Sequence, residues 1–290
     1  MNTPSLTLAG IIAALGVASL GSVQAATTVL LNENFDTYST VADVNAAGWY
    51  FRNTSSSGAL WGDPQTLNEA PLSGMTLHHG GGSTGNTWVL KQWSGTTLTS
   101  LGDSLTLSFD AVLGSGNEFD VGLLDASQTL SGNALGGASP IAGATGYGYV
   151  QTASTAGVVG IISGSGTTSS STDPSTSSND LNTFLDTLST LPSITGTALS
   201  FSLVITKVAT GAQVDFYQGS TLLSSSIDTS ATDSLTFNTI KLRAFNNSNL
   251  DNVVLTYATA AVPEPSTAAC FTGIVTLCLA LVRRRRGYTV

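Results

Sequence analysis

Ser104-Leu105-Thr106-Leu107-Ser108-Phe109-Asp110-Ala111-Val112 alternates polar and apolar side chains along its length. The same alternation recurs at residues 198–206 and 235–243. Successive side chains of a β-strand point to opposite faces of a sheet, so each stretch would bury one face and leave the other in water. These three stretches therefore predict half-buried strands of antiparallel sheets.

Shorter apolar stretches, separated by glycine-rich turn signals, extend this pattern through the middle of the chain. They predict strands at residues 28–31, 87–93, 119–124, 147–151, 158–162, 213–217, 221–227 and 251–257. About a dozen short strands in one span predict an all-β protein, built as a single antiparallel two-sheet sandwich of jelly-roll type.

One short helix is predicted among the strands. Its apolar residues share one face at helical spacing: Leu181, Phe184, Leu185 and Leu188. Asn179 or Asp180 can cap its first turn. Residues 164–178, mostly Ser, Thr and Gly, predict a flexible surface loop before it. The strand pattern resumes afterwards, so the body is predicted to be one domain.

Uncharged apolar segments lie at both ends of the chain. Residues 6–23 lead into Val23-Gln24-Ala25, a small-x-small cleavage site for signal peptidase. This combination predicts a secretory signal peptide over residues 1–25. A retained N-terminal anchor is the alternative.

Residues 266–282 contain no charge and would form a helix of roughly 25 Å, at the short end of what spans a bilayer. The arginines at 283–286 would stay cytoplasmic, which places the body on the other side of the membrane.

The C-terminal tail combines a Pro-Glu-Pro triplet, the apolar run and the arginine cluster. Its defining residues are Val262, Pro263, Glu264, Pro265, Ser266, Arg283, Arg284, Arg285 and Arg286. Together they closely resemble the PEP-CTERM sorting signal of Gram-negative bacteria. The resemblance implies recognition of residues 262–290 by an exosortase, a membrane transpeptidase-like enzyme, and delivery of the body (residues 26–261) to the cell surface or biofilm matrix. The alternative is a plain membrane anchor with a proline-rich hinge.

The segment between these ends is strongly acidic and lacks cysteine. Residues 26–262 hold five basic and 17 acidic residues, a formal charge of −12. Binding to nucleic acid needs a basic footprint, so no nucleic-acid partner is expected. Both cysteines, Cys270 and Cys278, lie in the apolar tail, so disulfides are not expected to stabilise the body.

The two ends of the body suggest a structural calcium ion. Residues 32–36 and 250–256 resemble the first and last strands of jelly-roll domains, of the concanavalin-like and carbohydrate-binding kinds. Those strands lie side by side, so Glu33, Asp36 and Asp251 could converge as oxygen ligands. The alternative is that all three are solvated acids beside strands.

Tryptophans are the candidate platforms on which sugar rings could stack: Trp49, Trp61, Trp88 and Trp93. Odd spacing places Trp88 and Trp93 on opposite faces of one strand, so at least one ring is expected outside the core. The alternative is that these aromatic rings fill the core of the sandwich.

Catalytic signals are weak. Glu118-Phe119-Asp120 partly resembles a strand of laminarinase-like glycoside hydrolases, which need two carboxyl groups about 5 Å apart. The family's third acid is missing, because Gly122 stands near its place.

The adjacent His78 and His79 would point to opposite sides of a strand and suit a metal poorly. No catalytic residue is therefore predicted.

Taken together, these signals predict an exported, non-enzymatic structural or adhesive protein of the cell surface or exopolysaccharide. Its expected partners are the signal peptidase, an exosortase, exopolysaccharide and, transiently through residues 266–282, the inner membrane. The alternatives are a carbohydrate-binding module and a laminarinase-like glycoside hydrolase.

Overall fold

The computed structural model describes residues 25–53, 62–79, 87–114, 119–135, 141, 143–152, 155–163, 183–184, 196–230, 235–244 and 248–260. One compact unit, Thr27–Ala260, holds every element named below. The terminal segments Met1–Ala26 and Ala261–Val290 form a separate unit.

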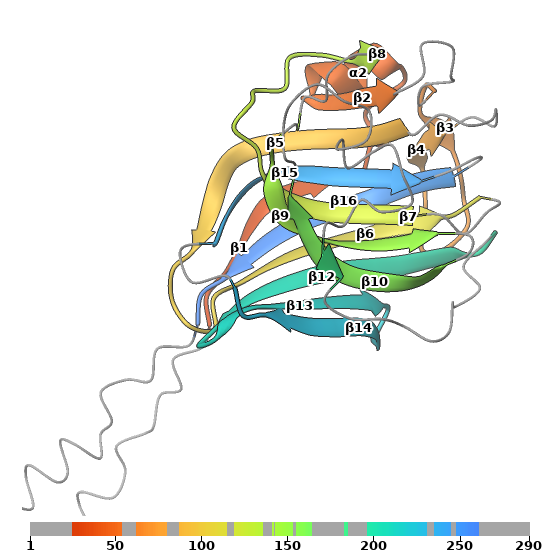
Figure 1. The fold of residues 1–290 in the computed structure, drawn as a ribbon. Coiled ribbons are helices and arrows are strands. Elements are labelled where there is room, and N and C mark those ends of the chain that lie inside the picture. Colours follow the sequence, from red (N-terminus) through yellow and green to blue (C-terminus); the bar gives the residue numbers. More distant parts are fainter. Residues whose placement is uncertain are drawn as a thin grey trace, which may run out of the picture. The chain divides into compact units, whose positions relative to one another are not determined.

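Two eight-stranded sheets form the compact unit (Figure 1). The first runs in the order β14 (Thr221–Asp228), β13 (Gly211–Gln218), β12 (Ala198–Val208), β6 (Ser104–Val112), β16 (Ser248–Ala258), β4 (Met75–His79) and β3 (Gln65–Thr66), with β1 (Thr27–Glu33) also paired to β16. The second runs β11 (Thr183–Phe184), β10 (Thr155–Ser163), β9 (Thr145–Thr152), β7 (Phe119–Asp125), β15 (Leu235–Ala244), β5 (Thr87–Leu98), β2 (Trp49–Asn53) and β8 (Ala134–Leu135). The predicted all-β, two-sheet antiparallel sandwich is confirmed, with β2 and β8 as a parallel exception.

Every strand predicted from the sequence is present, within a few residues at its ends. The predicted helix is wrong at Thr183–Phe184, which form β11 and pair with Gly160 and Ile161 of β10. Its remaining residues lie outside the part of the chain that the structure describes. Pairing to the edge of a sheet overrides a short helical periodicity, because local propensity is a weak preference that tertiary contacts outweigh.

The short helix that the structure does contain is α2, Val41–Ala46. Thr40 precedes it, and its hydroxyl accepts a hydrogen bond from the Asp43 backbone N–H at 3.2 Å. The Asp43 carboxylate in turn accepts from the Thr40 backbone N–H at 2.9 Å. This reciprocal capping box satisfies donors that a helix start would otherwise leave without partners.

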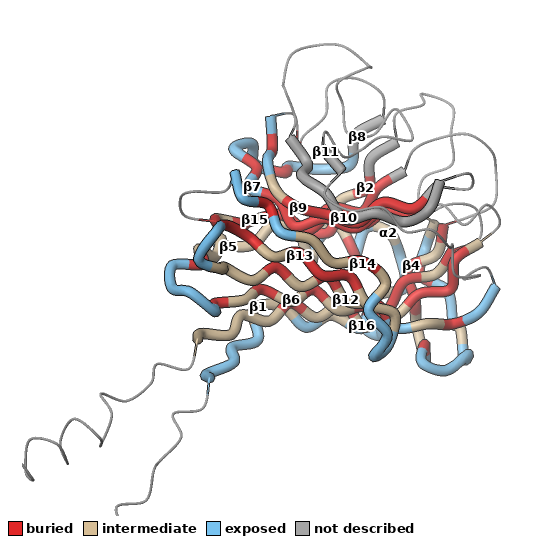
Figure 2. The backbone as a smooth tube through the Cα atoms, turned by 60° about the horizontal axis from the view of Figure 1, so that its bottom comes forward, coloured by how far each residue is buried: buried red, intermediate tan, exposed pale blue. Residues whose placement is uncertain are grey.

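The space between the sheets is filled by large aromatic rings. In Figure 2, buried residues alternate with half-buried ones along strands such as β6 and β12. Phe216 of the first sheet stacks on Tyr149 of the second, with ring centroids 3.8 Å apart and planes 14° from parallel. Phe109 of the first sheet meets Phe119 of the second at 5.5 Å. Burial of each such side chain stabilises the fold by roughly 2 kcal/mol.

The last strand, β16, lies in the middle of the first sheet. One of its edges pairs with β6 along most of its length. Its other edge is shared, because residues 248–250 pair with β4 and residues 253–258 pair with β1. The first sheet is therefore incomplete until the last strand of the body has been added.

Both ends of the compact unit lie at one corner, where Thr27 of β1 pairs with Ala258 of β16 (Figure 1). The buried Asp103 carboxylate organises this corner. It accepts from the backbone N–H groups of Ala260 at 3.0 Å and Ser100 at 2.8 Å, and from the Tyr257 hydroxyl at 3.1 Å. Burial alone would raise the pKa of Asp103, but these hydrogen bonds outweigh it and lower the pKa.

Replacing Asp103 is expected to weaken this corner in a pH-dependent way. Asp103→Ala leaves the partly exposed donors of Ser100, Tyr257 and Ala260 without this acceptor, so the free energy of unfolding at pH 7 should fall by about 2 kcal/mol in urea titrations. The carboxylate's contribution is present above its unfolded pKa of 3.8 and is lost as the pH falls through the lower folded value. The deficit of the variant should therefore shrink in strong acid. An equal deficit at pH 3 and pH 7 would contradict this role.

Candidate functional site

Burial removes two of the four tryptophans from the candidate sugar platforms. Trp49 and Trp88 are both 0% exposed. Trp49 lies in the main core, with its ring centroid 5.4 Å from that of Phe35. Trp93 is half-buried against the same core, and its Nε1 donates to the Thr96 hydroxyl at 3.2 Å. Trp61 lies outside the described residues.

Trp88 belongs to a second apolar cluster on the outer side of the second sheet. The cluster consists of Trp88, Leu90, Leu124, Ala126, Leu130, Ile141, Ala144 and Val150. Trp88 and Trp93 thus do face opposite sides of β5, as their spacing predicts. The Trp88 ring is nevertheless buried and not exposed as expected, because residues beyond the end of β7, such as Leu130 and Ile141, cover its side of the sheet.

The candidate hydrolase strand holds a buried ion pair. Asp120 of β7 lies opposite Arg243 of β15, and Arg243 Nη1 is 2.6 Å from Asp120 Oδ2. Both side chains are almost fully buried, so the Asp120 carboxylate neutralises a cation inside the protein. Glu118 lies outside the described residues. The geometry gives Asp120 a structural role and no access to a substrate.

The histidine pair is split in the way that strand geometry predicts. His79 is 3% exposed, and burial followed by the nearby His78 lowers its pKa. His78 Nδ1 lies 3.1 Å from the side-chain oxygen of Asn249. Among the residues that the structure describes, no group of three His, Cys, Asp or Glu side chains is placed to hold a metal ion.

The proposed calcium ligands are likewise divided. Glu33 turns to the core, where its Oε2 accepts from the Tyr38 hydroxyl at 2.8 Å and from Trp49 Nε1 at 3.4 Å. Its Oε1 accepts from the Phe35 backbone N–H at 3.1 Å. Both oxygens are therefore occupied by protein donors, and Glu33 does not fit the expected three-carboxylate site.

Asp36 and Asp251, in contrast, are brought together. They hold one short segment between them, since the Met75 backbone N–H donates to Asp36 at 2.9 Å and that of Ser73 to Asp251 at 3.4 Å. Gly74 between them has φ +83°, and a Cβ there would lie 1.9 Å from Asp36 Oδ1. Only glycine allows so close an approach.

These contacts lie where β4 and β1 share the edge of β16. Asp251 pairs with Asp110 of β6, and a register shift follows in which Asn252 adopts φ +50°. We refer to Asp36, residues 73–75, Asp110, Asp251 and Asn252 as the Asp251 junction. Burial, with further contributions from the charges of Asp36 and Asp110, raises the pKa of Asp251 to about 6.

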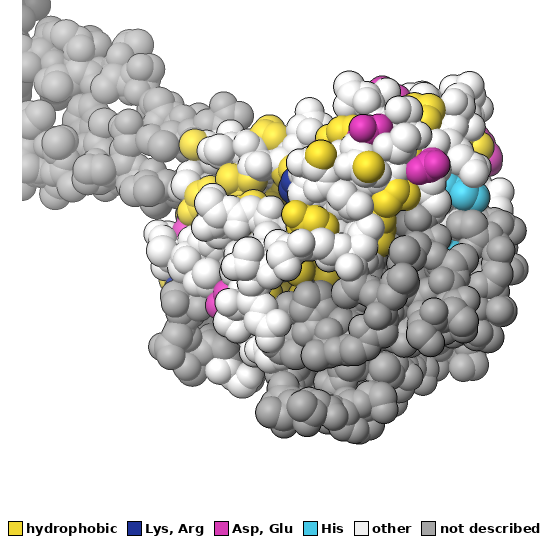
Figure 3. All heavy atoms as spheres, turned by 90° about the horizontal axis from the view of Figure 1, so that it is seen from above, with side chains coloured by type: hydrophobic (Ala, Val, Ile, Leu, Met, Phe, Trp, Pro, Cys, Tyr) yellow, Lys and Arg dark blue, Asp and Glu magenta, His cyan; other side chains and the backbone are white. Residues whose placement is uncertain are grey.

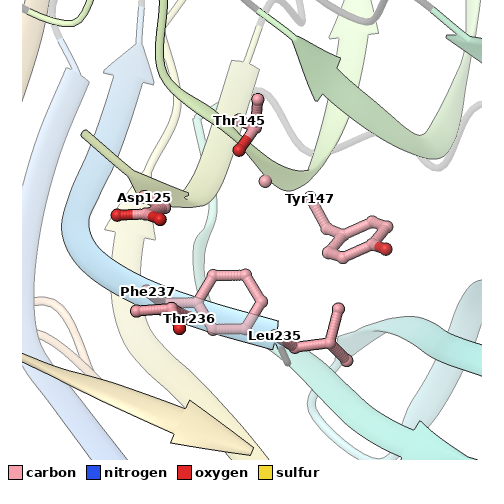
Figure 4. A pocket seen from close by; sticks show the side chains of 7 residues that line it. Asp125, Thr145, Tyr147, Leu235, Thr236 and Phe237 are labelled. Carbon is pink, nitrogen blue, oxygen red and sulfur yellow. The ribbon is translucent and has the colours of Figure 1, made fainter. Parts of the chain in front are cut away.

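A small pocket opens at the end of β7 (Figure 4). It has a volume of about 150 Å³ and is lined by Asp125, Thr145, Gly146, Tyr147, Leu235, Thr236 and Phe237. Directly after the end of β7, the Ala126 backbone N–H donates to the side-chain oxygen of Asn238 at 2.8 Å. Tyr147 and Phe237 are only 4% and 1% exposed. Ligand clefts typically measure about 300–1,000 Å³, so this pocket cannot enclose an oligosaccharide.

Only a part of these two places could be predicted from the sequence. The Asp251 junction joins four segments far apart in the chain, and only the pairing of β1, β4 and β6 with β16 brings them together. The pocket likewise combines the end of β7 with the starts of β9 and β15. Only the meeting of Asp36 and Asp251 was predicted from the sequence, because the first and last strands were expected to lie side by side; residues 73–75, Asp110 and the pocket were not predicted.

Comparison with known proteins places the chain in no established family. No protein-family model and no curated protein matches it. Among solved structures it is similar to the metal-free carbohydrate recognition domain of Emp46p, at 11% identity over 79% of this chain and 94% of that one, with a TM-score of 0.43. It is also similar to a Bacillus subtilis protein of unknown function with a galectin-like fold, at 9% identity over 81% and 99%, with a TM-score of 0.45.

A third similar structure is the carbohydrate-binding module CBM66 from Bacillus subtilis, at 12% identity over 71% of this chain and 93% of that one, with a TM-score of 0.36. Likenesses of this degree do not transfer a ligand or an activity to this chain.

The ion pair between Asp120 and Arg243 is expected to act in stability. Asp120→Asn leaves a buried guanidinium without its carboxylate, and should lower the free energy of unfolding by about 3 kcal/mol in urea titrations. The double variant Asp120→Val/Arg243→Met should be less destabilised than the single variant, because no charge then remains buried without its partner. Wild-type stability of Asp120→Asn would rule this role out.

Proposed function

We propose that this chain is an exported, non-catalytic surface or matrix protein, sorted by an exosortase through its C-terminal tail. The observation that best supports the proposal is the pairing of Thr27 with Ala258. This pairing brings the start and the end of the folded body to one corner. A leader that precedes Thr27 and a tail that follows Ala260 would therefore both join the body at this corner.

The arrangement of strands fits removal of both ends. Every described strand lies between Thr27 and Ala258, so cleavage after Ala25 and within the Pro-Glu-Pro segment would cut no strand of either sheet. Ala260, the last residue with a described contact, is held by Asp103 and lies three positions before Pro263. The body can thus keep its fold whether it is anchored or released.

The membrane-spanning part of the proposal rests on the sequence of residues 266–282, which lie outside the described residues. Within the described part of the chain, no helix has the length and apolar character needed to cross a bilayer.

The surface and interior of the body support a non-catalytic role. The one catalytic candidate that the structure describes, Asp120, is paired with Arg243. The face in Figure 3 shows acidic side chains scattered among polar and hydrophobic ones, with very little basic surface. Such a surface favours solubility and neutral or hydrated partners such as exopolysaccharide over nucleic acid.

Two tail variants test the sorting proposal in the native host. Replacing Pro263, Glu264 and Pro265 by alanine should leave a full-length precursor in the inner membrane, since the segment that the processing enzyme reads is lost. Replacing the arginines at 283–286 by alanine should also reduce surface delivery, because the orientation signal is removed. Cell fractionation, with an antibody against the body, reports both the size and the location of the product.

Glu69→Ala is the matched control, because it removes one exposed acidic side chain from the body and leaves the tail intact. It should be processed and delivered like the wild type. Identical size and location for the wild type and both tail variants would overturn the proposal. Retention of full-length wild-type protein in the membrane would favour a plain anchor.

A further inference from the structure

The outward side of the first sheet is built mainly from short side chains that carry hydroxyl or methyl groups. Residues paired on neighbouring strands share one face of a sheet, so the register fixes the members of that face. On β6 they include Ser104, Thr106 and Ser108, whose partners on β12 are Thr206, Val204 and Ser202. All of these are half-buried and alternate with buried core residues (Figure 2). We refer to this outward side of β14, β13, β12, β6, β16 and β1 as the hydroxyl face.

One aromatic ring lies on the hydroxyl face. Tyr217 of β13 pairs with Ser202 of β12, which places the Tyr217 ring among the outward side chains. Other half-buried aromatic residues pack against the apolar clusters of the body: Tyr38, Tyr50, Trp93 and Tyr257. Among the aromatic residues whose burial the structure describes, Tyr217 alone is neither buried nor packed against such a cluster. Its ring is therefore available to a partner.

Exposed aliphatic side chains lie on the same face as Tyr217. Leu222 of β14 pairs with Tyr217 and is 49% exposed, and Ile227 pairs with Gln213 and is 47% exposed. Val29 of β1, 59% exposed, lies at the opposite margin of the face, where it pairs with β16. Three of the four exposed large hydrophobic residues in the described part of the chain therefore belong to this face. Exposed apolar surface rimmed by polar residues is typical of binding surfaces.

The hydroxyl face carries little charge, although the body as a whole is acidic. Among the described strands that form it, β12 holds the one basic residue, Lys207, and pairing with a core residue of β13 places Lys207 on the inner side. Both outward acids, Asp110 and Asp215, already accept hydrogen bonds from neighbouring side chains. For Asp215 the donors are Gln213 Nε2, at 3.0 Å, and the Ser225 hydroxyl. Such a surface does not attract a polyanion and suits an uncharged partner rich in hydroxyl groups.

A row of side chains crosses the strands of the hydroxyl face. Tyr217, Ser202, Ser108 and Val254 lie opposite one another on β13, β12, β6 and β16. Neighbouring strands are about 4.8 Å apart, so the row spans roughly 14 Å. A row of this length can contact more than one ring of an extended polymer, and it needs no enclosing pocket.

We propose that the hydroxyl face binds a neutral polysaccharide chain laid along this row, with the Tyr217 ring stacked on the apolar face of one sugar ring. The hydroxyl groups along the row exchange hydrogen bonds with those of the polymer. The inference rests on the proposed function, which supplies exopolysaccharide as the partner, and adds the surface that binds it. A second copy of the chain fits less well. Protein–protein interfaces centre on apolar and aromatic residues, whereas serine, threonine and valine occupy the centre of this face.

Binding of the full chain to polysaccharide from the native host tests the proposal. The exopolysaccharide is separated by anion exchange into a neutral and an acidic fraction, and each fraction is immobilised for surface plasmon resonance. The chain is kept in a zwitterionic detergent without sugar groups, so that the detergent does not compete for the face. Saturable binding to the neutral fraction, and much weaker binding to the acidic one, is the expected result.

Substitutions at three positions locate the binding surface. Tyr217→Ala should weaken the affinity for the neutral fraction about tenfold, whereas Tyr217→Phe keeps the ring and should stay within about twofold of the wild type. Thr106→Lys places a long charged side chain in the middle of the hydroxyl face and should abolish binding. Thr145→Lys makes the same change at an exposed position of β9 in the second sheet, and should bind like the wild type.

The proposal is overturned if the wild type shows no saturable binding to the neutral fraction, or if Tyr217→Ala and Thr106→Lys bind as tightly as the wild type. Loss of binding in Thr145→Lys alone would assign the polymer to the pocket at the end of β7 and contradict the proposal. A wild-type dimer that Thr106→Lys dissociates, in sedimentation analysis without polysaccharide, would make the face an interface between copies, with the same consequence.

Urea titrations establish that each variant is folded. Should Tyr217→Ala fail to fold, Thr106→Lys and its control Thr145→Lys decide the matter. Sorting is read from the size and location of the product in the cell, whereas binding is read from the purified chain. A chain that is sorted and does not bind contradicts the hydroxyl face alone, and a chain that binds and is not sorted contradicts the sorting proposal alone.

Discussion

Insertion of β16 between β6 and the pair β1 and β4 is the interaction on which the rest of the structure depends. A strand with partners on both edges satisfies its backbone donors and acceptors inside the sheet, where water cannot. Because β16 is the last strand of the body, its insertion also closes the first sheet around the N-terminal strand. The common corner of the two termini and the Asp251 junction both follow from this single placement.

Buried carboxylates carry much of the long-range order in a body without cysteine. Asp103 holds the C-terminal end of the body, Asp120 pairs with Arg243 across two strands, and Asp228 accepts from the Tyr147 hydroxyl across the sandwich at 2.8 Å. Each acid is removed from water at a cost, and each recovers stability through donors placed by distant strands. Asp251 is the exception, because its donors are few and its nearest charged neighbours are also acids.

The same features shape the functional picture. Rings that could have formed sugar platforms are used to fill two apolar clusters, and the pocket at the end of β7 is small. The body is a two-sheet sandwich whose first and last strands meet at one corner, and its sequence is acidic with few charged residues overall. Such a unit suits display or incorporation into a hydrated matrix, where solubility and a single attachment point are sufficient. In the proposed function, the tail carries the addressing information.

The sequence by itself determined the fold class, because side chains that alternate along residues 104–112, 198–206 and 235–243 leave a strand only one way to bury its apolar face. It also determined the acidic charge and the predicted targeting ends. Only the tertiary structure decided the roles of individual polar and aromatic residues. Glu33 accepts hydrogen bonds from Tyr38 and Trp49, Trp88 is covered by a second cluster, and Thr183 and Phe184 join a sheet edge instead of a helix. Each outcome depends on segments distant in sequence, and local patterns do not encode which of them become neighbours.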